Sequence, residues 1–111
     1  MELSKKVCKP CEGVGDLLGM EKISELLIQL NSWELVDGKL QKKFRFRDFR
    51  EGMEFANSVA KIAEEENHHP DILIRYGSVS LTLFTHFLKG LTENDFIVAA
   101  KIDELSNLSK L

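Results

Sequence analysis

The chain has 111 residues, a formal net charge of −3, 43% hydrophobic residues and 30% charged residues. This length predicts one domain, large enough to bury a core without disulfide or metal cross-links. A slightly acidic chain is not typical of general nucleic-acid binders, which depend on an excess of Lys and Arg. No apolar run approaches the roughly 20 residues of a membrane span, and residues 1–7 lack the apolar core of a signal peptide. We therefore expect a cytoplasmic protein that binds neither nucleic acid nor membranes.

Residues 1–19 contain three glycines and the two cysteines of the chain, Cys8 and Cys11. Two thiols cannot fill a tetrahedral zinc site, and a redox Cys-x-x-Cys pair normally stands where a strand enters a helix. We expect 1–19 to be a flexible, non-catalytic lead-in, followed by a single folded domain over 20–111. Metal capture between subunits is the minor alternative for the thiols.

The first predicted helix covers 20–31, where apolar residues recur at helical spacing on one side. The expected buried stripe is Met20, Ile23, Leu27 and Leu30. Asn31 and Ser32 are expected to end this helix.

The next two predicted elements are the strands of a β-hairpin. Asp37-Gly38 is a strong two-residue turn signal, and strands over 33–36 and 39–46 flank it. Alternate positions of the second strand are apolar, which predicts one packed face and one solvated face. These apolar positions are Leu40, Phe44 and Phe46. Lys42 breaks the alternation and predicts a strand edge or a bulge.

Basic side chains are concentrated in the same stretch, at Lys39, Lys42, Lys43, Arg45, Arg47 and Arg50. We interpret them as the solvated face of a sheet. A nucleic-acid patch is disfavoured because no aromatic side chain alternates with the cations on that face, whereas Phe44 and Phe46 have core parity.

A second helix is predicted over 48–67, beginning with a capping-box-like pattern at Asp48 and Glu51. The expected buried stripe is Phe49, Met53, Ala56, Ala60 and Ala63, and its small alanines would let the helix lie close to a sheet. The last turn contains Glu64, Glu65 and Glu66, where the helix dipole opposes negative charge. This placement indicates that at least one of the three has a purpose beyond stability.

A second hairpin is predicted from strands over 72–76 and 79–87, joined at Gly77-Ser78. Because side chains alternate along a strand, His86 should point away from the face that carries Leu81 and Leu83. A last helix begins at Thr92, a good N-cap residue. Its expected apolar stripe is Val98, Ile102 and Leu105.

The order is therefore helix, two strands, helix, two strands, helix. Strands joined by tight turns form antiparallel hairpins, and helices cover the apolar face of the resulting sheet. The predicted fold class is α+β, with a four-stranded antiparallel sheet and three helices packed on one face.

The three histidines of the chain are the strongest functional signal. His68-His69 precede Pro70, which disfavours helical dihedrals at His69 and so ends the helix. The paired imidazoles are then expected on an exposed corner between helix and strand. Imidazole titrates near pH 6.5, so these two residues, His86 and nearby carboxylates predict an acid–base site.

Two motifs at this spacing resemble the pterin-4a-carbinolamine dehydratase family. They are His68-His69-Pro70, and Thr85-His86 followed by Gly90-Leu91-Thr92-Glu93-Asn94-Asp95. The resemblance extends over about 33–104 and implies the same α-β-β-α-β-β-α fold. It implies dehydration of a 4a-hydroxytetrahydropterin to the quinonoid dihydropterin, without a metal or redox cofactor. It also implies a homodimer or homotetramer, and an aromatic amino-acid hydroxylase in the same pathway.

The resemblance also assigns roles to individual residues. By motif position the catalytic set is His68, His69 and His86, with His68 and His86 transferring protons and His69 holding the pterin. The expected substrate-binding or orienting residues are Glu64, Asn67, Pro70 and Asp95. Of these, Glu64 is expected to orient His68, and Asp95 to orient His86 or contact the pterin. Asn67, Ile72 and Asn94 depart from the residues common in the family.

Two other functions compete with the dehydratase. One is a non-catalytic binding or assembly module on the same fold, with a protein partner. The other is a metal site that uses the three histidines and Glu64. Adjacent side chains of an extended chain point apart, which disfavours joint ligation by His68 and His69.

Overall fold

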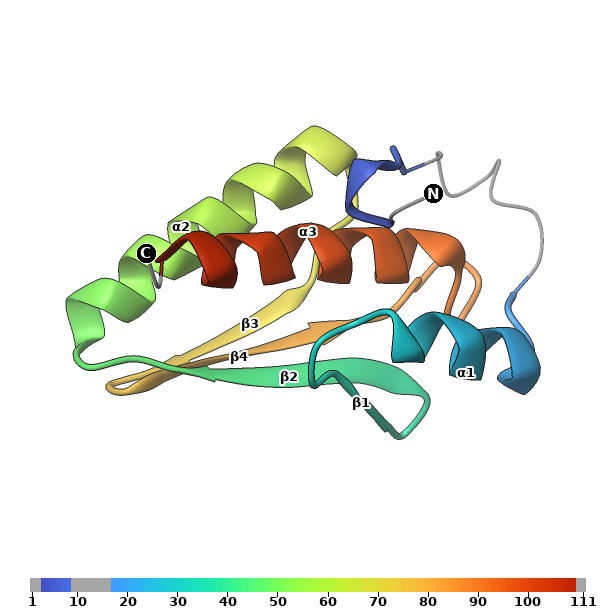
Figure 1. The fold of residues 1–111 in the computed structure, drawn as a ribbon, viewed down its shortest axis with the longest axis horizontal. Helices are drawn as coiled ribbons and strands as arrows, with labels where there is room; N and C mark the ends of the chain where they lie inside the picture. The colour runs from blue at the N-terminus through green and yellow to red at the C-terminus, as the bar shows by residue number, and fades with distance from the viewer. Residues whose placement is uncertain (1–2, 9–16, 110–111) are drawn as a thin grey trace.

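The computed structural model describes residues 3–8 and 17–109. Helices α1 (Met20–Ile28), α2 (Phe49–Glu66) and α3 (Glu93–Ser109) lie on one side of an antiparallel sheet (Figure 1). The strands run in the order β1-β2-β4-β3. They are β1 (Glu34–Val36), β2 (Lys39–Arg45), β3 (Asp71–Arg75) and β4 (Ser78–Leu83). The predicted α+β fold class is confirmed.

Both hairpins form, and their turns have a clear local cause. Asp37 and Gly38 have positive φ angles of 50° and 77°, as the tightest two-residue turns require. The second turn lies at Tyr76-Gly77, because Ser78 already pairs with Arg75. The predicted turn at Gly77-Ser78 is therefore wrong by one residue.

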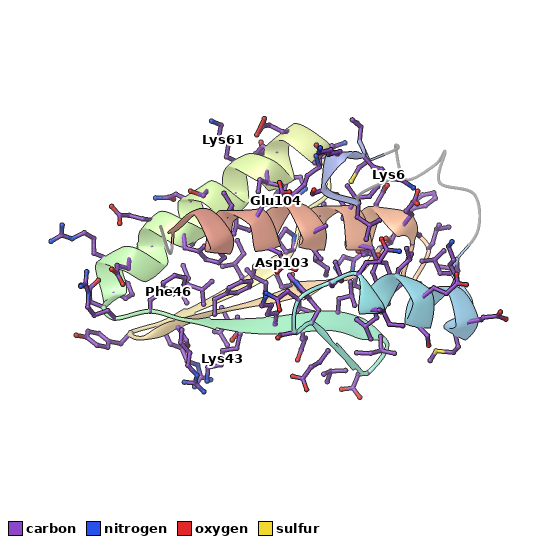
Figure 2. All side chains as sticks on the ribbon, viewed as in Figure 1. Lys6, Lys43, Phe46, Lys61, Asp103 and Glu104 are labelled. Carbon is purple, nitrogen blue, oxygen red and sulfur yellow. The ribbon has the colours of Figure 1, made fainter. Side chains whose placement is uncertain are left out.

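Lys42 does not mark a bulge, because the register between β2 and β4 is unbroken. Its side chain points toward the helices, and Nζ lies 2.8 Å from Oδ1 of Asp103, with both side chains only 11% exposed. Asp103 also accepts hydrogen bonds from Trp33 Nε1 at 2.9 Å and from the backbone N–H of Asn31 at 3.1 Å. Figure 2 shows Asp103 between α3 and the sheet. The break in apolar parity thus indicates a buried ion pair.

The predicted apolar stripes of α1 and α2 are partly wrong. Ile23 of α1 is buried as expected, but Met20 is 63% exposed. In α2, Phe49 and Ala60 are exposed. Ala56 and Ala63 are buried as predicted, and α2 also buries Gly52, Phe55 and Val59.

The aromatic core explains why α2 takes this rotation. The ring of Phe55 lies 4.6 Å from the ring of Phe44 and 5.1 Å from that of Phe46, both centroid to centroid. Small residues of α2 face the core, as expected: Gly52, Ala56 and Ala63 are all buried. A Cβ at Gly52 would lie in ordinary contact with Cγ2 of Val79, at 3.4 Å.

Helix α3 is central to the core, and its predicted residues Val98 and Ile102 are fully buried. The short 3₁₀ helix η1 (Leu3–Lys5) packs on the side of α3 that faces away from the sheet (Figure 1). Leu3 is only 5% exposed and belongs to the core. Residues 3–8 of the expected lead-in therefore pack on α3, which offers them an apolar surface, and the flexibility of the lead-in stays a prediction. Cys11 lies outside the described residues.

Within the described ranges, no helix has the length and apolar character needed to cross a membrane.

Replacing Asp103 by Ala should lower the free energy of unfolding by about 3–5 kcal/mol, because the buried charge of Lys42 would lose its carboxylate partner and keep only the Asn31 carbonyl as an acceptor. Trp33 Nε1 would lose its acceptor as well. Urea unfolding monitored by Trp33 fluorescence measures the change. Lys43→Ala is the matched control, because Lys43 is exposed and points away from the helices (Figure 2); it should change the free energy by less than about 0.5 kcal/mol. Equal unfolding midpoints for the two variants would contradict a stabilising role of the buried pair.

Candidate active site

The C-terminal end of α2 separates the two neighbouring histidines. Asn67 takes the left-handed conformation, with φ 53° and ψ 42°, which Asn adopts more readily than most residues. His68 donates its backbone N–H to Ala63 O at 3.1 Å and closes the helix end. After this turn the His69 side chain is exposed, as expected, but the His68 side chain is buried, with 5% exposure, so the expectation of two exposed imidazoles is wrong for His68. Pro70 follows and β3 begins at the next residue.

A buried carboxylate holds His68. Nε2 of His68 lies 2.7 Å from Oδ1 of Asp95, whose side chain is 0% exposed. Oδ2 of Asp95 accepts from the Thr85 hydroxyl at 2.7 Å and from the Thr92 backbone N–H at 2.9 Å. The hydroxyls of Thr85 and Thr92 are 2.9 Å apart, so the Thr92 hydroxyl can donate to that of Thr85. Both oxygens of Asp95 are therefore engaged, and the His68 ring is fixed.

His69 has a different partner in a different environment. Its Nε2 lies 2.5 Å from Oε2 of Glu64, and their side chains are 53% and 76% exposed. The expectations that Glu64 orients His68 and that Asp95 orients His86 are therefore wrong. The one-turn spacing from Glu64 to His68 assumed that the helix continues, but it ends at Glu66 and turns at Asn67.

His86 lies in a loop that is closed by a bridge between Thr85 and Gly90. β4 ends at Leu83, so the predicted strand to Phe87 is too long. His86 is exposed, as expected, and its ring meets that of Phe84 edge-on at 5.2 Å. Because Thr85 hydrogen-bonds Asp95, the backbone of His86 starts one residue from the network that holds His68.

Among the described residues, no group of three or more His, Cys, Asp and Glu side chains is arranged to hold a metal ion.

The model of the family described as pterin 4 alpha carbinolamine dehydratase matches residues 16–105. The chain belongs to this family. Relatives from Rubrobacter xylanophilus and Legionella pneumophila (strain Corby), both provisionally named pterin-4-alpha-carbinolamine dehydratase, are 50% and 48% identical over 105 and 107 residues. These alignments cover 94% of this chain, and 98% and 95% of the two relatives.

Two solved structures are similar to this dehydratase-family chain. A crystal structure of a transcriptional coactivator/pterin dehydratase from Brucella melitensis has a TM-score of 0.77 and 33% identity, covering 81% of this chain and 98% of that one. A pterin dehydratase-like protein, described as a RuBisCO assembly factor in the alpha-carboxysome, has a TM-score of 0.58 and 28% identity. The alignment covers 68% of this chain and 90% of that protein's chain.

In this dehydratase-family chain, Thr85 and Thr92 belong to the site, although sequence reasoning did not select them as site residues. The spacing of Thr92 and Asp95 is that of a capping box, in which the third helical residue bonds back to the N-cap N–H. That pattern would have predicted the bond between Asp95 and the Thr92 N–H. Nothing local in the sequence pairs Thr85 with Asp95, because this contact depends on the loop after β4.

Thr85→Val should lower the free energy of unfolding by about 1–3 kcal/mol, because it removes a buried donor to a buried carboxylate. The Thr92 hydroxyl would lose its acceptor as well. Thermal or urea unfolding measures the effect. Thr82→Val is the matched control, since Thr82 is half-buried in β4 and lies outside the Asp95 network; it should change the free energy by less than about 0.5 kcal/mol. A neutral Thr85→Val would show that the hydroxyl is not needed to hold Asp95.

Proposed function

We propose that this chain dehydrates a 4a-hydroxytetrahydropterin to the quinonoid dihydropterin, in the recycling of the pterin after aromatic amino-acid hydroxylation. The observation that carries the proposal is the link from His68 through Asp95 to Thr85, which joins the paired histidines to the loop of His86. Membership of the dehydratase family supports it.

The chemistry requires two proton movements and no electron transfer to an external group. One proton reaches the 4a-hydroxyl, which departs as water, and one proton leaves a ring nitrogen as the new double bond forms. A carboxylate accepts hydrogen bonds but donates none, so contact with Asp95 puts the hydrogen of a neutral His68 ring on Nε2. Nδ1 of His68 then has a free lone pair, which suits the general base. The exposed His86 is assigned the role of the acid.

The exposed pair of His69 and Glu64 is assigned to pterin binding. Neutral or charged, the imidazole of His69 can donate a hydrogen bond, while the carboxylate of Glu64 accepts. Asn67 and Pro70 act indirectly in this proposal, since they set the chain direction that separates His68 from His69.

His86→Ala should reduce the rate of dehydration by about 10²–10⁴-fold, because it removes the proposed proton donor. His69→Ala should raise KM more than it lowers kcat, since it removes a binding contact. The rate, kcat and KM of both variants are measured in an assay of 4a-carbinolamine dehydration with the pure protein.

Lys61→Ala is the control for the assay, because Lys61 is exposed on α2 (Figure 2). It should leave both constants unchanged. Wild-type turnover in folded His86→Ala would remove His86 from the mechanism.

The competing proposal is a non-catalytic binding or assembly module. It is supported by the similar protein described as a RuBisCO assembly factor, which has a related fold at 28% identity. The same assay separates the two proposals. No dehydration by the folded wild-type chain, with pterin supplied, would favour the module.

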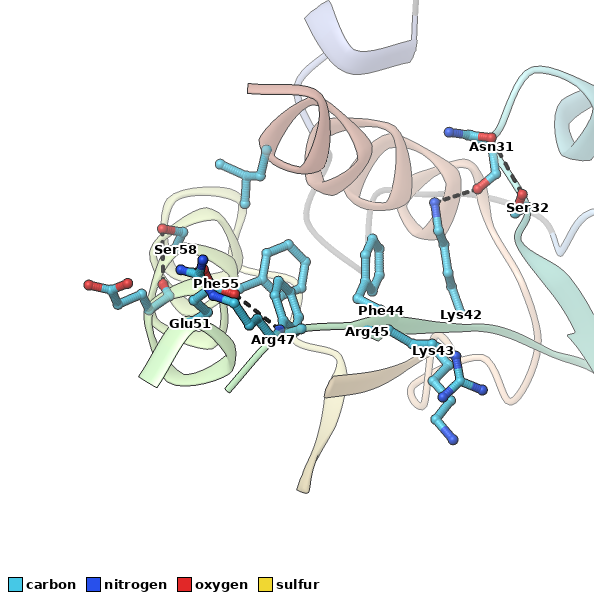
Figure 3. A pocket seen from close by; sticks show the side chains of 13 residues that line it. Asn31, Ser32, Lys42, Lys43, Phe44, Arg45, Arg47, Glu51, Phe55 and Ser58 are labelled. Carbon is cyan, nitrogen blue, oxygen red and sulfur yellow. Dashed lines mark hydrogen bonds and ion pairs between the residues drawn. The ribbon is translucent and has the colours of Figure 1, made fainter. Parts of the chain in front are cut away.

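We further propose that the chain forms a homodimer or homotetramer, as expected from the family. β1 pairs only with Lys39–Gln41 of β2, so the rest of that strand edge has no strand partner among the described residues. A groove of about 810 Å³ follows this edge past Lys42 and Phe44, between β2 and α2 (Figure 3). Unpaired edge groups favour pairing with another strand, and a second copy offers the same edge for antiparallel pairing.

Light scattering after size exclusion should give a mass of about two or four times 12.7 kDa. Association through backbone pairing depends little on salt, so the mass should hold at high ionic strength. A monomer mass at micromolar concentration would contradict this proposal.

A cytoplasmic location and a shared pathway with an aromatic amino-acid hydroxylase stay predictions.

A further inference from the structure

We propose that residues Leu3–Cys8, here called the N-terminal clip, keep the His68–Asp95 pair in place by tying α2 to α3, with Glu66 as the positioning residue. The inference rests on the proposed function for its kinetic consequence, but its structural part is independent of that function. It also gives a role to part of the segment around the cysteines, which the proposed chemistry does not use.

The clip is fastened along α3. Leu3 is buried against the core. Lys6 Nζ lies 2.7 Å from Oε2 of Glu93, in the first turn of α3. Farther along the helix, the Ser4 hydroxyl donates to Glu104 at 2.8 Å. Lys6 and Glu104 both lie on the side of α3 that faces away from the sheet (Figure 2).

Glu66 connects the clip to the end of α2. It is the last residue of that helix, and its Oε1 accepts the backbone N–H of Cys8 at 2.8 Å. Its Oε2 lies 3.6 Å from Nζ of Lys101, which also donates to the Ser4 carbonyl at 2.9 Å. The side chains of Glu66 and Lys101 are 11% and 21% exposed. One carboxylate thus joins α2, α3 and the clip.

These contacts explain why a carboxylate stands where the helix dipole opposes it. Negative charge at a helix C-terminus is unfavourable by a few tenths of a kcal/mol or more, but Glu66 gains a backbone donor and a largely buried cation. Glu65, its exposed neighbour in the same turn, has neither contact.

The catalytic consequence follows from the position of Glu66. It lies two residues before His68, and its partner Lys101 is on the same helix as Asp95. The bond between His68 and Asp95 spans the two helices, so relative movement of the end of α2 and the start of α3 would stretch it. Misplacement of a reacting group by about 1 Å can cost about 10²-fold in rate.

The Cys8 thiol supports a structural role for the clip. It is partly buried and contacts the carbonyl oxygen of Asn94 at 3.7 Å, next to Asp95. Burial, reinforced by the Glu66 carboxylate, raises the pKa of the thiol to about 12. With this pKa the thiol is protonated at neutral pH, so Cys8 packs at the site as a neutral group. The reactive form is the thiolate, which supports a structural role for Cys8.

Three variants of the full chain test the proposal: Glu66→Ala, Glu66→Gln and the matched control Glu65→Ala. Glu66→Ala should lower kcat by about 10- to 100-fold with a smaller change in KM, whereas Glu65→Ala should change kcat by less than about twofold. Glu66→Gln keeps an acceptor for the Cys8 N–H but loses the charge that faces Lys101, so its kcat should be intermediate.

A second readout does not depend on turnover. The ring N–H of His68 that faces Asp95 should give a downfield proton resonance, protected from exchange with water. In Glu66→Ala this proton should exchange at least about tenfold faster, because the helix ends separate more often, and in Glu65→Ala it should not change.

The two readouts separate failure of this proposal from failure of the proposed function. If the wild-type chain does not dehydrate the pterin, the exchange of the His68 proton still decides whether Glu66 positions the pair. An exchange rate and kcat in Glu66→Ala equal to those in Glu65→Ala would overturn the inference. So would a loss of thermal stability with an unchanged His68 resonance, because Glu66 would then be merely structural. If Glu66→Ala does not fold, Glu66→Gln is judged by the same criteria.

Discussion

The arrangement of the site depends on one buried carboxylate. Asp95 is fully removed from solvent and accepts hydrogen bonds from an imidazole, a hydroxyl and a backbone N–H that come from three separate parts of the chain. A buried charge is tolerated only where such partners compensate for the lost hydration. The requirement to satisfy Asp95 therefore brings together the end of α2, the loop after β4 and the start of α3. The same requirement makes the His68 ring a fixed group rather than a mobile one.

A second buried carboxylate, Asp103, holds other segments of the chain together farther along α3. Asp103 gathers Lys42 of β2 together with Asn31 and Trp33 from the connection between α1 and β1. One helix thus carries two acidic side chains that face different partners, eight residues apart in the sequence. The apolar surface of α3 between them fills the core. Polar contacts fix the position of the helix, and hydrophobic burial supplies most of the driving force.

Local signals in the sequence predicted the elements well, and the reasons are local. The turn at Asp37-Gly38, the N-cap at Asp48 and the helix end before Pro70 each depend on the backbone preferences of one to three residues. The rotation of α2 could not be predicted in this way. Several of its faces carry apolar residues, and packing of Phe55 between Phe44 and Phe46 decides which face is buried.

The same distinction applies to the candidate site. The three histidines and the carboxylates of Glu64 and Asp95 could be selected from the sequence, because their residue types carry the chemistry. Their pairing could not, since helical spacing assigned Glu64 to His68, whereas a single left-handed residue at Asn67 redirects the chain. Thr85 and Glu66 act through partners distant in sequence, so only the tertiary structure identifies them.

The raised pKa of Cys8 has a consequence for how the protein tolerates oxidants. The thiolate, not the thiol, attacks peroxides and disulfides, so a cysteine that remains protonated reacts slowly with them. The Cys8 thiol, which contacts the Asn94 carbonyl and lies near the Glu66 carboxylate, should therefore react slowly with such oxidants.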